Sequence, residues 1–381
     1  MSAAVLAAEP LWLTARRAVA MDRFAARGLP TAKDEAWRFT NLHALTARAP
    51  SGTARLTLSA APEGVTFTRL STLLAQAPER LEALLALPEG ADALSALNLA
   101  MFSDGYVLEV APGLHLDAPL EVSHDNQGRA VHMRALVLLG EGASATLVER
   151  ANGSGWSNNV THAVLGAGAR LRHAKLQAQA ADSVHLSAMT LTLGAGADHE
   201  SVILALGAGV SREAVTTALT GEGATASLRG AYLLGGKQQA SFVPELLHLA
   251  RNCTSRQLVK GVLGGTAHGV FLGHIGVPEG GDGTNAGQTN RNILLSPGAR
   301  VDTRPRLEIL ADDVKCSHSA TVGALDETAL FYLQSRGLAP PQARRMLIEA
   351  FAADIVDGAD LPAPQRESLQ QALSFWAETL A

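Results

Sequence analysis

Apolar and polar positions divide the chain into three zones with different periodicities. Residues 1–100 are rich in Ala and Leu, and their apolar residues recur at helical spacing, for example over residues 70–87. Short apolar runs separated by Gly turns follow over residues 101–325, and helical spacing returns over residues 326–381. The pattern therefore predicts a β core between an N-terminal mostly helical region and a C-terminal helical region. Residues 56–67 have strand-like alternation and can be assigned to either of the first two zones.

Gly-bracketed turns recur at a nearly constant interval in the middle zone. They begin at Leu139, Leu165, Leu193 and Leu219, so successive turns are 26, 28 and 26 residues apart. Self-similarity at such a period indicates a solenoid, and short strands joined by tight Gly turns favour a β-solenoid over a helical one. An irregular β-sandwich with Gly turns is the alternative. We therefore expect a mainly β protein with a right-handed parallel β-helix core and α-helical regions on both sides.

The C-terminal zone predicts three helices. Asp326 fits an N-cap and Gly337 a C-terminal stop for the first helix. Pro340 opens the second, and the third follows Pro362 and ends near Trp376. Solenoids need terminal caps, so these helices fit a cap that packs on the end of the solenoid.

Composition narrows the function without identifying it. The net charge is −5 and only 18% of residues are charged, so the chain lacks the basic footprint of a nucleic-acid-binding protein. No apolar run approaches the roughly 18 residues of a membrane span, and the N-terminus has no continuous apolar signal region. The two cysteines, Cys253 and Cys316, cannot form a disulfide framework. We expect a soluble protein of a reducing cytoplasm.

Cys316 and His318 are the most distinctive pair of chemically active side chains. Alternation along a strand puts both on one face, where a thiol and an imidazole can share a soft metal or an iron–sulfur species. A Cys–x–His pair is also common as ordinary strand core. His268 and His274 share a strand face too, but ordinary strand positions explain them better, and Cys253 fits packing alone.

The residues around this pair resemble a known family. Residues 307–337 contain ADDVKCSHSATVG followed by LDETALFYLQSRG, which is similar to the motif of the SufB/SufD family of iron–sulfur cluster assembly proteins, and of SufD most closely. Residues 254–263 and 285–290 match a second block, TSRQLVKGVL and NAGQTN, and residues 35–40 match a weaker third block, EAWRFT. A motif of this length is far more specific than a short pattern.

The resemblance implies a role and a set of site residues. A SufD-like chain is a non-catalytic subunit that pairs with a SufB-like paralogue through the β-helix and docks the ABC-type ATPase SufC through its C-terminal helices. His318 is then an iron or cluster ligand at the SufB interface, where a nascent iron–sulfur cluster is held transiently, and Cys316 either supports it or packs within the rung. No cofactor is expected to stay on the isolated chain. The residues expected to contact partners are Leu330, Phe331, Tyr332, Arg336, Met346 and Phe351.

Two departures refine this interpretation. SufB-type members have a cysteine near residues 285–292, where this chain has none, which favours SufD over SufB. Ser319 stands where the family usually has Gly. If that position needs a positive φ, Ser319 is strained; if it allows close approach of a partner, the hydroxymethyl group of Ser319 narrows the gap. The chain also has no phosphate-binding loop, so nucleotide hydrolysis must belong to a partner.

Other classes of protein explain the sequence less well. A carbohydrate-active β-helix enzyme needs aromatic residues to stack sugars, and only 4% of this chain is aromatic. A hexapeptide-repeat acyltransferase needs a six-residue period, which is not visible. A self-associating solenoid that forms a homodimer remains open, because an edge that pairs with a paralogue can pair with itself.

Overall fold

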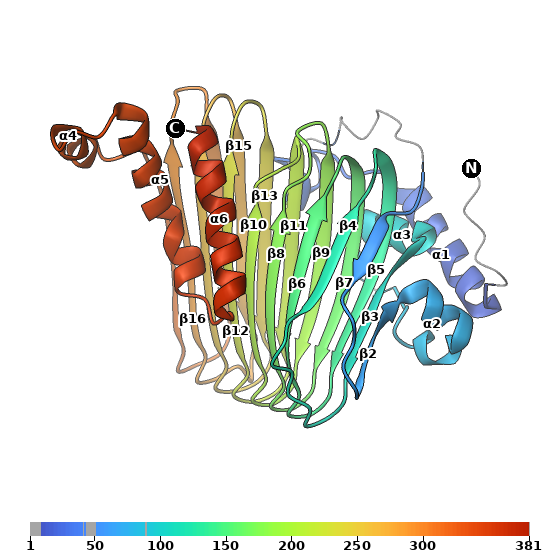
Figure 1. The fold of residues 1–381 in the computed structure, drawn as a ribbon. Helices are drawn as coiled ribbons and strands as arrows, with labels where there is room; N and C mark the ends of the chain where they lie inside the picture. The colour runs from blue at the N-terminus through green and yellow to red at the C-terminus, as the bar shows by residue number, and fades with distance from the viewer. Residues whose placement is uncertain (1–8, 41, 43–50, 88–89, 381) are drawn as a thin grey trace.

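The computed structural model describes residues 9–40, 42, 51–87 and 90–380 (Figure 1). Two nine-stranded sheets face each other across a shared core and form a β-solenoid, with helices at its start and along its later turns. Consecutive strands alternate between the sheets, so each turn of the solenoid adds one strand to each. The predicted mainly β solenoid with flanking helices is confirmed.

The solenoid strands run in parallel within each sheet. One sheet has the order β1-β4-β6-β8-β10-β12-β14-β16-β18, and the other β17-β15-β13-β11-β9-β7-β5-β3-β2. The strand bounds are β3 Asp104–Val110, β4 Leu120–Asp125, β5 Arg129–Leu139, β6 Ser144–Asn152, β7 Gly155–Leu165, β8 Arg170–Gln177, β9 Val184–Leu193, β10 Asp198–Ala205, β11 Val210–Leu219, β12 Thr225–Leu234, β13 Gln239–His248, β14 Thr254–Leu263, β15 His268–Val277, β16 Asn285–Leu294, β17 Arg300–Ile309 and β18 Lys315–Gly323.

The predicted Gly turns connect the two sheets. Gly142, Gly168, Gly196 and Gly223 occupy equivalent places in successive turns, with φ of 64°, 64°, 61° and 72°. Only Gly adopts this left-handed conformation without a steric cost, so the turn chemistry fixes the repeat. Between the turns, alternate side chains point inward and form one apolar core that runs along the solenoid.

The N-terminal region combines helices with two strands. Its elements are α1 Leu11–Arg27, the 3-10 helix η1 Glu35–Trp37, β1 Arg55–Leu58, β2 Val65–Arg69, α2 Leu70–Gln76, the 3-10 helix η3 Pro78–Leu81 and α3 Ala93–Met101. The two strands pair antiparallel with β4 and β3, so the strand-like stretch belongs to the sheets. The helix predicted over residues 70–87 is shorter than expected. Pro78 disfavours helical backbone at the residue before it, and Ala77 has φ −150° and ψ 63°.

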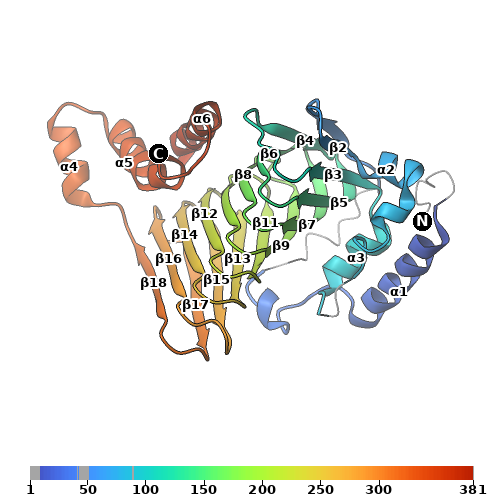
Figure 2. The same cartoon turned by 90° about the horizontal axis from the view of Figure 1, so that it is seen from below.

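Three C-terminal helices follow the last strand: α4 Glu327–Ser335, α5 Pro340–Asp357 and α6 Ala363–Leu380. The side chain of Asp326 caps α4, as the sequence predicts, whereas α6 extends beyond Trp376. Ile348, Ile355 and Leu373 pack on Val202 and Leu233, so α5 and α6 cover the outer face of one sheet (Figure 2). None of the described helices is long and apolar enough to span a lipid bilayer.

Charged side chains are buried inside the solenoid. Lys175 Nζ lies 2.7 Å from Glu213 Oε2, and both side chains are almost fully buried. Burial alone would raise the pKa of Glu213, but Lys175 and the hydrogen-bonded His185 outweigh burial and lower it to about 2. His173 Nε2 lies 2.9 Å from Glu149 Oε2, in the sheet that contains Lys175. Breaking such a pair leaves an uncompensated charge, so these residues make the fold sensitive to substitution and to acid.

Acid is expected to destabilise the fold before the carboxylates titrate. Burial lowers the pKa of His124 and His132 to about 4, and of His199 to about 3, from 6.5. The unfolded chain therefore binds more protons below pH 6.5, and stability is lost as pH falls from there towards 4, by roughly 2 kcal/mol per histidine at about pH 5. Urea unfolding at about pH 5 and pH 7.5 measures this. An unchanged midpoint would show that these histidines titrate normally in the fold.

Candidate functional site

The last turn of the solenoid presents two free strand edges. Among the described strands, β17 is hydrogen-bonded only to β15, and β18 only to β16, because each ends its sheet. Every residue of β18 is exposed except the half-buried Cys316. α5 and α6 lie against the side of the solenoid and leave this end uncovered (Figure 2). An exposed edge with unpaired N–H and C=O groups is a template for pairing with another chain.

Cys316 and His318 lie on the interior side of β18, as alternation predicts. In the register with β16, Cys316 is level with Ala286 and His318 with Gln288, and both β16 residues are buried. Cys316 packs against the apolar core, whereas His318 is exposed because no further turn covers it. The pair therefore stands at the open end of the solenoid interior, with the imidazole accessible and the thiol half covered.

The two side chains differ in their readiness to bind metal. Burial raises the pKa of the Cys316 thiol, so it stays protonated at neutral pH and must lose its proton to become a ligand. His318 stands one rung beyond Gln288, whose side-chain amide donates to Gln257 Oε1 at 2.7 Å. In the described part of the chain, no group of three His, Cys, Asp or Glu side chains is placed to hold a metal ion. A cluster takes about four ligands, so a partner would have to supply the rest.

Ser319 fits the strand without strain. Its backbone is outside the left-handed region, which among the described non-Gly residues holds only Gln127, Ala208, Asn252 and Asp313. Its hydroxyl faces the outer side and donates to Thr289 Oγ1 at 3.3 Å. The departure from the family's usual glycine therefore changes the outer face and leaves the His318 side unchanged.

Ser319→Gly is accordingly expected to have little effect. Surface changes away from special backbone positions alter stability by roughly 0.5 kcal/mol or less. Urea unfolding checks the stability, and anaerobic cluster assembly checks the iron–sulfur role that the resemblance implies. A large gain in assembly for the glycine variant would show that the hydroxymethyl group obstructs the interface.

The remaining sequence candidates have other surroundings. Cys253 is fully buried in the core, as predicted. Asp313 lies in the bend before β18 with φ 52°, a left-handed conformation that Asp tolerates in turns. His274 Nδ1 lies 3.0 Å from Glu245 Oε1, and His268 Nε2 lies 2.6 Å from Asp302 Oδ2. The two histidines thus pair with different carboxylates on neighbouring strands.

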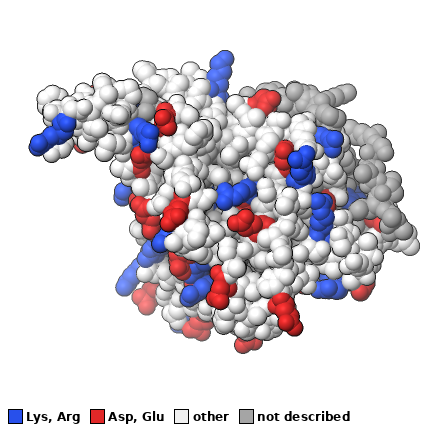
Figure 3. Space-filling model, viewed as in Figure 1, with Lys and Arg blue, Asp and Glu red and all other residues white. Residues whose placement is uncertain are grey.

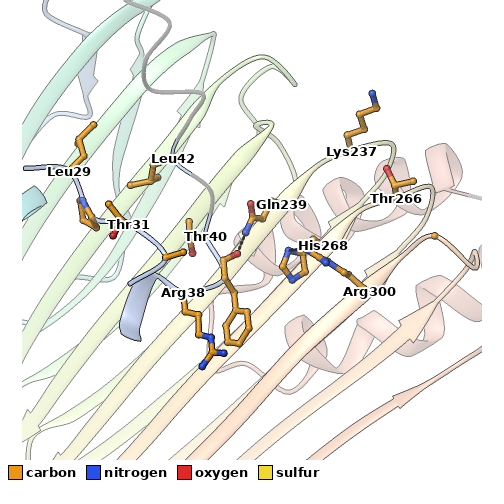
Figure 4. Close-up of a pocket in the computed structure, with 14 residues that line it drawn as sticks. Leu29, Thr31, Arg38, Thr40, Leu42, Lys237, Gln239, Thr266, His268 and Arg300 are labelled. Carbon is orange, nitrogen blue, oxygen red and sulfur yellow. Dashed lines mark hydrogen bonds between the residues drawn. The ribbon is translucent and has the colours of Figure 1, made fainter. Parts of the chain in front are cut away.

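His268 also lines a cavity of about 850 Å³ between the N-terminal segment and the later strands (Figure 4). Arg300 stands beside it, with Nη2 3.3 Å from His268 Nδ1. Across the cavity, the side-chain amide of Gln239 donates to the carbonyl of Phe39, which ties residues 35–40 of the third motif block to β13. The conspicuous N-terminal motif therefore holds the N-terminal segment against the solenoid.

The helix α4 exposes apolar side chains beside the open end. None of its residues is buried, and it projects away from the rest of the molecule (Figures 1 and 2). Phe331 is 72% exposed and Tyr332 is 55% exposed, with Arg336 stacked over the Tyr332 ring at 5.1 Å. Leu330 on α4 is half-buried. Exposed aromatic residues of this kind mark protein interaction sites.

The two α5 residues expected at a partner contact lie in different places. Met346 is exposed. Phe351 packs towards the solenoid, where its ring lies 4.7 Å from Lys260 Nζ. Two features are not predicted from the sequence: the exposed Phe375 of α6 and the buried Lys175–Glu213 pair. Charged residues at inward strand positions could have indicated the buried pair.

Fold and site together define a β-solenoid protein whose open end carries the Cys316 and His318 pair beside a helix with exposed aromatic residues. The family model for the SufBD core domain of the SUF system of FeS cluster assembly matches residues 122–351. The chain belongs to this SufBD family and resembles its SufD members. It therefore has a role in iron–sulfur cluster assembly.

Individual relatives agree with this assignment. An iron–sulfur cluster assembly SufBD family protein of Synechocystis is 29% identical, over 91% of this chain and 87% of that protein. A SufBD family protein of Mycobacterium tuberculosis is 30% identical, over 92% and 90%. The iron–sulfur cluster assembly protein SufD of Escherichia coli is 34% identical, over 63% of this chain and 59% of that protein.

Proposed function

We propose that this chain is a non-catalytic SufD-like subunit of an iron–sulfur cluster assembly complex in a reducing cytoplasm. Its solenoid end pairs with a SufB-like paralogue, and its C-terminal helices bind a SufC-like ABC-type ATPase. The observation that carries the proposal is the open last turn, where free strand edges and an accessible His318 occur together. The bound cluster or iron is cargo at this interface and does not stay on the isolated chain.

The solenoid end supports pairing with another solenoid. Two free edges at one end extend both sheets if a partner adds strands to them, which satisfies backbone groups that are otherwise left to water. His318 and Cys316 would then lie at the junction, within reach of thiolates from the partner. Each subunit needs to provide only part of the ligand set, which fits a chain with two cysteines.

The helix α4 supports docking of the ATPase. The chain has no phosphate-binding loop of its own, so the energy of nucleotide hydrolysis must enter through a bound partner. α4 offers the exposed Phe331 and Tyr332 on a helix that has no buried residue. Figure 3 shows acidic and basic side chains mixed over the face that it displays, without a continuous basic stripe that would favour nucleic acid.

Affinity purification of the tagged chain from its native extract under anaerobic conditions tests the proposal. We expect a P-loop ATPase and a larger cysteine-bearing solenoid paralogue to be recovered with it. Recovery of the chain alone, even after gentle crosslinking, would contradict the proposed complex. Sedimentation of the isolated chain then tests the second candidate, a homodimer formed through the same free edges.

A further inference from the structure

A groove of about 590 Å³ lies on the outer face of the last turns. β12, β14, β16 and β18 form its floor, and the end of α5 borders it at Asp354. Its lining includes four permanent cations, Arg229, Arg256, Arg291 and Lys315, and a single carboxylate, Asp354. Cys316 is also among its lining residues, but its side chain packs against the interior core, and His318 does not line the groove.

Two of the charges at the groove are already neutralised. The Arg229 side chain donates to Glu200 Oε1 at 2.8 Å and to the carbonyl oxygen of Asp354 at 3.1 Å. The Asp354 carboxylate lies 2.6 Å from Lys260 Nζ. The only acidic side chain of the lining is therefore committed to a lysine beneath α5, and it does not compensate the other cations.

The other three cations have no acidic partner among the described residues. Arg291 and Lys315 are exposed and form no ion pair there. Arg256 is fixed by hydrogen bonds to the carbonyl oxygens of Ser255 and Asn285 and to Asn285 Oδ1, at 2.7, 3.0 and 2.9 Å. These neutral acceptors orient its guanidinium and leave its charge uncompensated. Three unpaired cations in one groove stand out in a chain whose net charge is −5.

The floor of the groove carries small and polar residues beside Leu228 and Leu258. A side chain at Gly287 would place its Cβ 3.3 Å from Arg256 Cδ, so the glycine lets the arginine lie flat across β16. The hydroxyl groups of Ser227, Thr289 and Ser317 also line the groove. Hydroxyls donate and accept hydrogen bonds, and so can satisfy the backbone of a bound chain.

The spacing of the three unpaired cations fits an extended ligand better than a compact anion. Asn285, Gly287 and Arg291 all lie on β16. In the strand register, Lys315 of β18 is level with Asn285, and Arg256 of β14 is level with Gly287. Residues 285 and 291 are separated by about 20 Å of strand. Three cations spread over this length cannot converge on one tetrahedral anion. An extended chain presents same-side side chains every ~7 Å, which matches the spread.

We propose that this groove binds an extended acidic segment of a partner protein, with carboxylates on one side of the segment paired to Lys315, Arg256 and Arg291. The unpaired positive charges of the groove are complementary to the carboxylates of such a segment. β18 forms both the end of the solenoid and the far border of the groove, so a protein seated at that end can reach it. This contact is additional to the strand edges and α4, and it does not depend on the partner's identity.

Fluorescence anisotropy with the full chain tests the proposal. The probe is a fluorescein-labelled octapeptide of alternating Glu and Ser, and the matched peptide has Gln in place of Glu. We expect the Glu peptide to bind and the Gln peptide to bind much more weakly. Arg291→Glu with Lys315→Glu should weaken binding of the Glu peptide by roughly tenfold or more. Arg27→Glu with Lys33→Glu, at exposed N-terminal positions, changes the net charge equally and should have little effect.

Three results would overturn the proposal: equal binding of the two peptides, unchanged binding by the groove variant with normal urea unfolding, or equal weakening by the two variants. Inorganic phosphate is added as a competitor against sodium chloride of equal ionic strength. We expect no extra displacement by phosphate, and preferential displacement would assign the groove to a small oxyanion instead. Because the peptide is the only ligand, failure here leaves the proposed assembly complex untouched.

Discussion

Replacing His318 with Ala is expected to leave the chain folded and bound to its partners while cluster assembly falls by at least roughly tenfold. The side chain is exposed on an edge strand, so its removal creates no cavity. Removing a residue that only hydrogen-bonds to a metal ligand typically lowers metal affinity or activity by roughly 10- to 100-fold. Removing a ligand itself is expected to lower it at least as much. Anaerobic reconstitution with the partner proteins, iron and a sulfur donor measures the effect as cluster absorption and acid-labile sulfide.

Two matched variants make this result specific. His115→Ala removes another exposed histidine near the opposite end of the solenoid, beside Ser144, and should assemble clusters normally. Cys316→Ser should have a smaller effect than His318→Ala, because the thiol is half-buried and burial raises its pKa. Normal assembly by the His318 variant in an intact complex would remove the imidazole from the mechanism.

Placing Asp at both Phe331 and Tyr332 is expected to abolish ATPase binding while the fold remains intact. No residue of α4 is buried, so the changes disturb no core contact. Exposed aromatic anchors commonly contribute 2 kcal/mol or more to an interface, which corresponds to roughly 30-fold in affinity for each. Calorimetric titration of the chain with the SufC-like ATPase measures the loss.

Phe375→Asp is the control for this experiment. Phe375 is 66% exposed on α6, so its substitution adds the same charge to another C-terminal helix. We expect ATPase affinity to be retained in this variant. If both sets of substitutions weaken binding equally, docking extends across the whole helical region, and if neither does, the ATPase binds elsewhere.

The solenoid could be predicted because local chemistry fixes it. The turn positions need left-handed backbone, only Gly adopts it freely, and the 26- to 28-residue spacing of these turns is visible in the sequence. Alternation within 315–323 likewise fixes the side of the strand on which Cys316 and His318 lie.

Features that depend on distant parts of the chain could not be predicted. The Lys175–Glu213 pair joins residues on different sheets, and its partners are known only once the register of several turns is set. The groove beside β18 arises in the same way, from cations on four strands and a carboxylate near the end of α5. Pro78 indicates the end of the helix at Gln76, whereas the apolar spacing over residues 70–87 predicts that the helix continues.

The cluster content of the anaerobically isolated complex tests the central claim most directly. The SufB-like and SufC-like proteins are purified with and without this chain, and iron and acid-labile sulfide are measured per SufB-like subunit. Our account predicts a cluster in the complete complex and little or none when this chain is missing. Equal cluster content in the two preparations would contradict a role for this chain at the assembly interface.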